Sequence, residues 1–372
     1  MSEPGDLLDE ARRKRLGRGD FLKLAGGALG LGALAYYAGR YSEPLSPQRD
    51  GAQPLYVDDE VGFPVFRGPY LQSQAQMAVF FLPADRAQLS ALCDRYLNLP
   101  TGGALRYTPL LSSVVMIYAE MRVASQDGRD QQVGRLAETE LSFWLLTAAA
   151  RQVGSTYLPQ HLAWFLPYLL VDESNAIATG REVYGFNKQM AVFEKAANIQ
   201  QPEFAADVLG FQQFDPAAEA QPQRLLTLRP AAGSSVGAGG GGWADWEAAR
   251  AALSGELLRR IAGEADDPTI EMAARLATQS APLVFLKQFR DAADTSRACY
   301  QAVIEAPVGV EQFAGGDYLP GVSTLRVNPL VSHPLARRLG LRLVDGEQQT
   351  TLGAWLKLDF TLGAGVEVWR AV

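Results

Sequence analysis

The chain has 372 residues and a formal net charge of −7; 48% of its residues are hydrophobic and 20% are charged. This length and composition allow one large domain, or two small ones, with a sizeable core. The acidic balance argues against nucleic acids and anionic membrane surfaces as main partners, because both require a basic face.

The first part of the chain has the layout of a targeting segment. Basic residues gather between Arg12 and Arg18, ahead of an apolar run from Leu24 to Ala38 that is rich in glycine and alanine. Residues 18–23 are similar to a twin-arginine export signal, with Gly19 in place of the second arginine. We therefore expect residues 1–40 to be an export-signal-like leader or a membrane anchor. The protein would then be exported (periplasmic) or membrane-tethered, and the alternative is a cytoplasmic protein.

A linker and the first regular elements are predicted next. Residues 41–61 form the linker, because prolines recur between Ser42 and Pro54. The apolar run Gln76–Leu82, which ends at Pro83, predicts a strand. A helix is predicted over Asp85–Leu97, with Asp85 as its N-cap.

Three more runs have the length and composition of strands. Ser113–Val123 is rich in β-branched and aromatic residues, and Glu140–Ala148 and His161–Val171 are mainly apolar. Several short strand-forming runs with few helices are typical of an α+β fold built on a mainly antiparallel β barrel or sandwich.

The middle of the chain differs in composition. Ser234–Gly242 consists almost entirely of glycine, serine and alanine and is expected to be flexible. Asp245 can cap a following helix whose apolar face includes Trp246, Ala249, Leu253, Leu257 and Ile261. A second helix is predicted from about Asp267 to Ala277. Residues 232–278 are therefore interpreted as a glycine-rich and helical insertion.

Strand-like composition returns after the insertion, at Ala281–Phe289, Ala298–Ala306 and Leu358–Trp369. Residues 62–372 are accordingly expected to form one domain that is interrupted by the insertion.

Cysteine and histidine are scarce. Cys93 shares the apolar face of the first predicted helix, which favours a buried thiol, and Cys299 cannot be paired with it from sequence. His161 adjoins an apolar run and His333 precedes a proline. We therefore expect neither a metal site nor a histidine-based triad.

Residues 176–188 hold the strongest functional signal. The segment Ala176–Lys188 reads AIATGREVYGFNK, a Gly-Arg-Glu turn followed by aromatic residues, a glycine and one lysine. Burial of a lysine in apolar surroundings disfavours the ammonium and frees the amine to attack a carbonyl. The alternative is a solvated lysine beyond a strand, with Gly180 and Gly185 serving turns.

This segment resembles the signature of the acetoacetate decarboxylase family, in which such a run precedes the lysine that forms a Schiff base. Phe66–Tyr70 and Ala281–Asp291 resemble two flanking segments of that family. The resemblance covers about residues 62–342. It implies that Lys188 forms the imine and that no organic cofactor or metal is needed.

The resemblance also implies further site residues. One family glutamate matches Glu140, with Glu138 as a close rival, and the other has no confident counterpart and falls near Met116. Arg181 and Glu182 would orient the loop, or form a structural ion pair at a strand end.

Three positions depart from the family pattern. Gln189 stands where the family has a second lysine, Asn187 where it has proline, and Ala75 where it has arginine. Without the neighbouring cation, apolar burial must lower the pKa of Lys188.

The expected function is that of a Schiff-base-forming lyase that decarboxylates a small-molecule β-keto acid. Aldol or dehydratase chemistry on a keto acid through the same imine is a related hypothesis. The first alternative is a non-catalytic binding protein for an apolar or anionic small molecule. The second is an assembly protein that uses the inserted helices as its contact surface. A homo-oligomer is left open.

Overall fold

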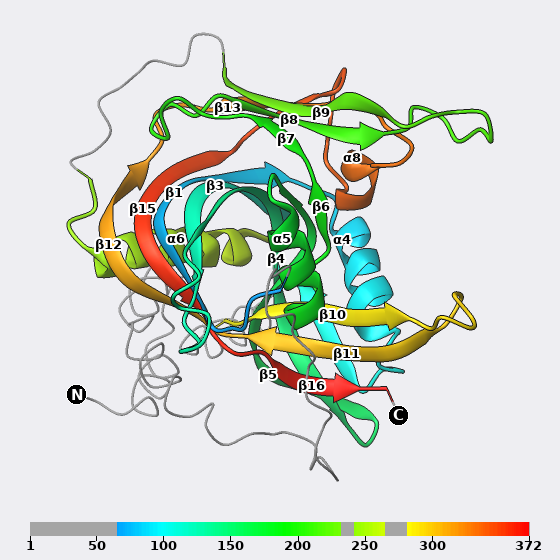
Figure 1. Cartoon of the computed structure of the whole chain (residues 1–372). Helices are drawn as coiled ribbons and strands as arrows, with labels where there is room; N and C mark the ends of the chain where they lie inside the picture. Colours follow the sequence, from blue (N-terminus) through cyan, green and yellow to red (C-terminus); the bar gives the residue numbers. More distant parts are fainter. Residues whose placement is uncertain (1–64, 232–241, 265–280, 372) are drawn as a thin grey trace, which may run out of the picture.

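The computed structural model describes residues 65–231, 242–264 and 281–371. In these ranges the chain forms two β-sheets with a few helices (Figure 1). The predicted leader, the linker, the glycine-rich stretch up to residue 241 and the second helix of the insertion lie outside the described residues. Among the helices that are described, none has the length and apolar character needed to cross a membrane.

The larger sheet is mixed and has eleven strands in the described residues, most of them paired antiparallel. Its main path runs in the order β12-β15-β1-β3-β4-β5-β10-β11-β16, while β2 pairs with β4 and β6 pairs with β5. The strands are β1 (Tyr70–Pro83), β2 (Leu105–Pro109), β3 (Ser113–Ser125), β4 (Leu136–Val153), β5 (Thr156–Val171), β6 (Lys188–Met190), β10 (Leu283–Arg290), β11 (Ala298–Ala306), β12 (Val308–Tyr318), β15 (Leu352–Leu362) and β16 (Val366–Arg370).

The smaller sheet is antiparallel and follows the order β14-β13-β9-β8-β7. Its strands are β7 (Val192–Glu194), β8 (Phe204–Gly210), β9 (Gln221–Pro230), β13 (Ser323–Val327) and β14 (Glu347–Gln349). The helices are α4 (Arg86–Cys93), α5 (Ser174–Thr179), α6 (Trp246–Glu264) and α8 (Leu335–Leu339), with single π-helical turns η1 (Asp94–Asn98) and η2 (Gly180–Tyr184).

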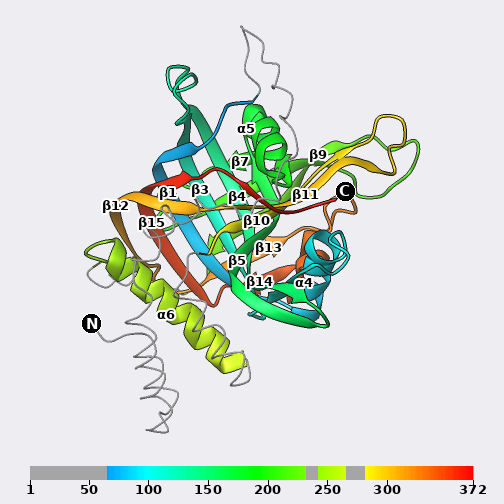
Figure 2. The same cartoon turned by 90° about the horizontal axis from the view of Figure 1, so that it is seen from below.

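The larger sheet is strongly curled, and two helices lie at its opposite ends. Viewed down the curl, α5 projects inside the ring of strands, and α6 runs across the ring from the side of β12 (Figure 1). After rotation by 90°, α5 lies at the upper end of the strands and α6 at the lower end (Figure 2). The hollow of the sheet is therefore bounded by one helix at each end.

The expected α+β fold is confirmed, but a closed barrel is not seen in the described residues, because the strand order has two ends, β12 and β16. Only Pro307 separates β11 from β12, and three residues separate β15 from β16. A Cβ at Gly363 would lie 2.7 Å from the Pro307 ring, and one at Gly365 would lie 2.7 Å from Ile304. The single predicted strand Leu358–Trp369 is thus interrupted at residues 363–365, where two glycines pack closely against neighbouring residues.

The two predicted helix caps are confirmed. The Asp85 side chain accepts a 3.0 Å hydrogen bond from the backbone N–H of Gln88 at the start of α4. Asp245 accepts a 2.9 Å bond from the backbone N–H of Ala248 in α6. Each carboxylate satisfies a donor that the first helical turn leaves free. The described part of the predicted insertion is therefore a capped helix.

The segment that carries the lysine motif forms a parallel crossover unit. The chain leaves β5, passes through α5 and η2, and returns as β6, which pairs with β5 in parallel with Lys188 opposite Leu169. Gly185 ends the helical turns with φ 89°. A Cβ there would lie 2.4 Å from the Cα of Lys287 on β10. Only glycine fits a position that combines this φ with this approach.

We predict that Gly185→Ala destabilises the protein more than Gly102→Ala does. Both glycines have positive φ, but a Cβ at Gly102 would have nothing within 4 Å. Positive φ alone costs about 1–2 kcal/mol, and the clash with β10 should add about 1–3 kcal/mol. Denaturant unfolding of the two variants checks the difference. Equal losses of unfolding free energy would contradict the close approach.

Candidate active site

Lys188 is buried although it is the first residue of a short strand. It is 8% exposed, and its Nζ lies 5.4 Å from the centre of the Phe186 ring. Two residues of the crossover unit, Tyr184 and Phe186, pack in one apolar cluster with Phe285 of β10. The parallel pairing with β5 thus fixes the lysine backbone while the aromatic cluster covers its side chain.

Two glutamates of β4 meet the lysine amine. Lys188 Nζ donates a 2.7 Å hydrogen bond to Glu138 Oε1 and lies 3.9 Å from Glu140 Oε2. Residues two apart on a strand face the same side, so β4 presents both carboxylates together. The sequence had favoured Glu140 with Glu138 as its rival. In the structure both are present, and Glu138 makes the closer contact.

The carboxylates reverse the expected shift of the lysine pKa. Burial by itself lowers the pKa of Lys188, but the charges of Glu138 and Glu140 and the hydrogen bond to Glu138 outweigh it and raise the pKa overall. The net shift is therefore opposite to the lowering that was predicted, although burial does act in the predicted direction. The prediction did not count the charges of the two glutamates toward the pKa, and the raised pKa favours the ammonium form of Lys188.

The pKa of Glu140 is raised, whereas the pKa of a carboxyl group in an ion pair is ordinarily lowered. Burial and the neighbouring charge of Glu138 raise the pKa of Glu140 to about 7, against the lowering effects of Lys188 and of a hydrogen bond with Ser142. The site therefore combines an ammonium, a carboxylate at hydrogen-bond distance and a carboxyl that titrates near neutrality. Such a set can both accept and deliver a proton.

Gly180 makes room for the lysine side chain. A Cβ at this position would lie 2.9 Å from Cδ and 3.0 Å from Cε of Lys188. The backbone of Gly180 is right-handed helical, with φ −64° and ψ −41°, so no unusual conformation requires a glycine. The glycine of the Gly-Arg-Glu turn is thus explained by the space that the lysine occupies.

The three ionisable groups line a cavity of about 220 Å³. Side chains from β1, β3, β4, β12 and β15 form its walls, and α5, η2 and Trp246 of α6 contribute to its ends. Apart from Lys188 and the two glutamates, the walls are almost entirely aliphatic and aromatic. A mostly apolar cavity with a few convergent polar groups is the common form of a small-molecule site.

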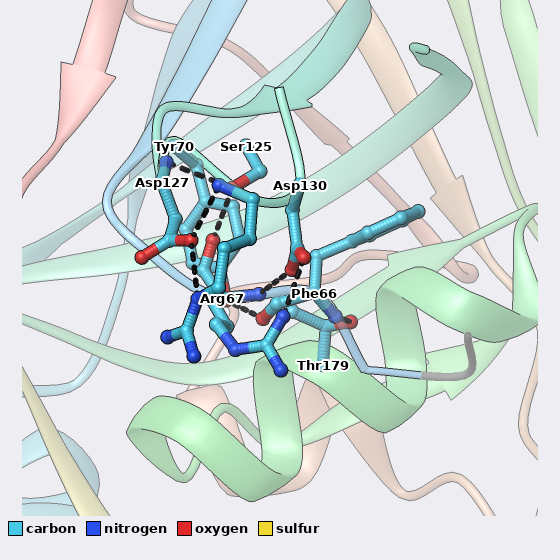
Figure 3. A network of polar contacts seen from close by, with 8 residues as sticks. Phe66, Arg67, Tyr70, Ser125, Asp127, Asp130 and Thr179 are labelled. Atoms are coloured by element: carbon cyan, nitrogen blue, oxygen red, sulfur yellow. Dashed lines mark hydrogen bonds and ion pairs between the residues drawn. The ribbon is translucent and has the colours of Figure 1, made fainter. Parts of the chain in front are cut away.

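A polar network holds the rim of the cavity next to α5 (Figure 3). Arg67 pairs with Asp130 in the β3–β4 connection at 2.5 Å, and its carbonyl accepts a hydrogen bond from Ser125 Oγ. The backbone N–H of Phe66 donates to Thr179 Oγ1 at 3.2 Å. Phe66 and Thr179 both line the cavity. Phe66–Tyr70, which resembles a segment that flanks the family signature, therefore helps to close the end of the cavity next to α5.

Arg181 and Glu182 do not line the cavity that contains the lysine. They line a second hollow of about 290 Å³, which shares Leu166 and Phe186 with the first cavity but contains neither Lys188 nor the two glutamates of β4. Arg181 is exposed. Their predicted role in orienting the loop stays a prediction.

The residues that depart from the family pattern also have defined surroundings in the structure. Asn187 donates a 2.9 Å hydrogen bond from its amide to the carbonyl of Pro167. Ala75 is buried with Ala119 and Met121, and Met116 lies in the main core. The position near Met116, where the sequence suggested that a family glutamate had become apolar, is thus part of the core, and the second carboxylate at the amine is that of Glu138. The alternation Glu138-Thr139-Glu140 was the sequence signal for it.

In the described ranges, no three His, Cys, Asp or Glu side chains are grouped as a metal site would require. The two cysteines are free, Cys93 buried and Cys299 exposed.

Comparison with known proteins identifies the fold but no sequence relative. No protein-family profile matches the chain. No curated protein matches it in sequence either.

Solved structures of acetoacetate decarboxylase are similar. The enzyme from Legionella pneumophila gives a TM-score of 0.53 at 12% identity, covering 87% of this chain and 94% of that one. A second acetoacetate decarboxylase structure gives 0.51 at 12% identity, over 83% and 93%. The enduracididine biosynthesis enzyme MppR, complexed with pyruvate, gives 0.50 at 13% identity, over 88% and 98%. The chain therefore has the fold of acetoacetate decarboxylase and of enzymes like it.

Proposed function

We propose that the protein is an imine-forming lyase that decarboxylates a β-keto acid through Lys188. The observation that carries the proposal is a buried amine held between Glu138 and Glu140 at the wall of an apolar cavity. The likeness to acetoacetate decarboxylase supports the same reading.

The first step requires the ammonium to lose a proton. Glu138 is the nearest base, because it already accepts a 2.7 Å hydrogen bond from Lys188 Nζ. The neutral amine then attacks the oxo carbon of the substrate. Loss of water from the adduct leaves an iminium ion, whose positive nitrogen can accept electrons.

The second step breaks the bond between the α carbon and the carboxylate. The electron pair of that bond moves into an enamine, and carbon dioxide leaves. Apolar walls favour this step, because a carboxylate loses its solvation there and neutral carbon dioxide does not. Glu140, with its pKa raised to about 7, gives a proton to the enamine carbon. Water then hydrolyses the iminium to release the ketone and the amine.

Two observations favour the alternative function, a non-catalytic protein that binds an apolar or anionic small molecule. The raised pKa of Lys188 and the place of Gln189 where the family has a second lysine both leave the resting amine protonated. A binding protein would retain the cavity but form no covalent adduct. Trapping of an imine therefore separates the two functions.

The cellular location of the protein is a separate proposal. The basic and apolar pattern of residues 1–40 supports export to the periplasm or tethering to a membrane.

We predict that borohydride together with a β-keto acid traps a covalent adduct on Lys188, detected by peptide mass spectrometry. Lys188→Arg should abolish the adduct, since a guanidinium does not form the imine. Lys195→Arg is the matched control, because Lys195 is half exposed and pairs with Asp172 outside the cavity. The absence of adduct across a broad panel of keto acids, with folded protein, would reject the lyase proposal.

We predict that Gly180→Ala slows trapping, while the better helix propensity of alanine offsets part of the strain in the folded protein. The new methyl group would displace the Lys188 side chain, whose Cδ lies 2.9 Å from the position of the Cβ. Alanine in a helical turn is itself favourable, by up to about 1 kcal/mol relative to glycine. Parallel measurement of trapping rate and thermal unfolding checks both effects. Unchanged trapping would show that Gly180 does not position the amine.

The protonation of Glu140 can be tested through stability. Its folded pKa is raised from 4.5 to about 7, so between these pH values the unfolded chain loses a proton that the folded protein keeps. The unfolding free energy of the wild type should therefore fall across this window relative to Glu140→Gln. Denaturant unfolding at several pH values measures the difference, with exposed Glu219→Gln as the control. A pH-independent difference would refute the raised pKa.

A further inference from the structure

The cavity extends well beyond its ionisable end. Glu140 and Trp144 both line it and lie four residues apart on β4, which is roughly 13 Å at about 3.3 Å per residue. Trp246 of α6 lines the cavity as well, and α6 lies at the opposite end of the strands from α5 (Figure 2). The chamber therefore runs from the lysine toward α6.

The far half of this chamber is apolar. Ile117, Trp144 and Trp246 pack against one apolar cluster that includes Ala249 of α6. Among the described residues that line the cavity, Lys188 is the one cationic side chain, and Glu138 already bonds its amine. A phosphate or a second carboxylate would find no countercharge in the far half. An alkyl chain would contact aliphatic and aromatic side chains there.

The volume of the chamber also favours an alkyl chain. Its volume of about 220 Å³ is several times the ~30 Å³ that one water takes up in the liquid. The polar head of a small keto acid occupies only the end that holds the lysine. Filling the remainder with methylene groups removes them from water, and each buried methylene contributes up to about fourfold in binding.

We propose that the substrate is a β-oxo acid with an extended alkyl chain. The oxo carbon lies at Lys188, the carboxylate lies beside Glu140 when that group is protonated, and the chain runs along β3 and β4 toward Trp144 and Trp246. This inference rests on the proposed lyase function and adds to it the class of substrate. The products are a long-chain methyl ketone and carbon dioxide.

The test uses the full chain and a series of substrates: acetoacetate, β-oxooctanoate and β-oxododecanoate. Borohydride trapping at Lys188 is measured at increasing concentrations of each, so that the half-saturating concentration can be compared. We expect it to fall by at least about tenfold from acetoacetate to β-oxododecanoate, the lower bound that a few buried methylenes give. Trapping of all three with no gain from chain length would overturn the inference and leave the lyase proposal standing.

A second measurement does not depend on imine formation. β-Hydroxydodecanoate, the secondary alcohol that corresponds to β-oxododecanoate, cannot form an imine. Calorimetry gives its affinity for the wild-type protein. We expect it to bind more tightly than the corresponding short alcohol. Lack of binding would overturn the inference even if trapping succeeds, and binding without any trapping would reject the lyase step alone.

A variant locates the chain within the chamber. Ile117→Phe narrows the half toward α6, so it should weaken binding of the long alcohol, and the half-saturating concentration should rise more for β-oxododecanoate than for acetoacetate. Leu209→Phe is the matched control, because Leu209 on β8 is 65% exposed and outside the cavity. Equal effects of Ile117→Phe on the short and long compounds would contradict the proposed path of the chain.

Discussion

The site depends on one buried ion pair, that between Lys188 and Glu138. A charge placed in an apolar interior costs free energy unless a partner and hydrogen bonds compensate for it. The parallel pairing of β6 with β5 brings the lysine to the curled sheet, and β4 supplies the partner carboxylate. Removal of one member alone would leave the other buried without compensation, which typically costs about 3–5 kcal/mol. The pair therefore constrains both the local fold and the chemistry.

This constraint explains how an apolar cavity can coexist with three ionisable groups. Glu138 keeps the amine charged at rest, and the second carboxyl, Glu140, responds to burial and to Glu138 by holding its proton up to about pH 7. Net charge in the cavity is thereby limited near neutrality. Gly180 contributes by leaving the space that the lysine side chain needs. Within the motif that resembles the family signature, Gly180 thus has a steric role and Lys188 a chemical one.

Much of this arrangement could be predicted from local sequence. The strands that contain Gln76–Leu82 and Ser113–Val123, the cap at Asp245 and the burial of Lys188 follow from patterns of a few residues. The sign of the lysine pKa shift could not, because Glu138 is fifty residues away and its contact depends on strand register. Arg181 lines a different cavity from Gly180, because successive residues of a helical turn point in different directions. The strand Gln221–Pro230 of the smaller sheet was missed because it begins and ends with polar residues and proline and carries little apolar periodicity.

The most direct measurement of the central ion pair is the pKa of Lys188 itself, from NMR titration of its labelled Nζ in the wild type and in Glu138→Gln. The structure predicts a pKa above 10.5 in the wild type and a lower one in the variant, because the variant keeps the burial and removes the nearest charge. A wild-type pKa below that of free lysine, unchanged by the substitution, would contradict the account.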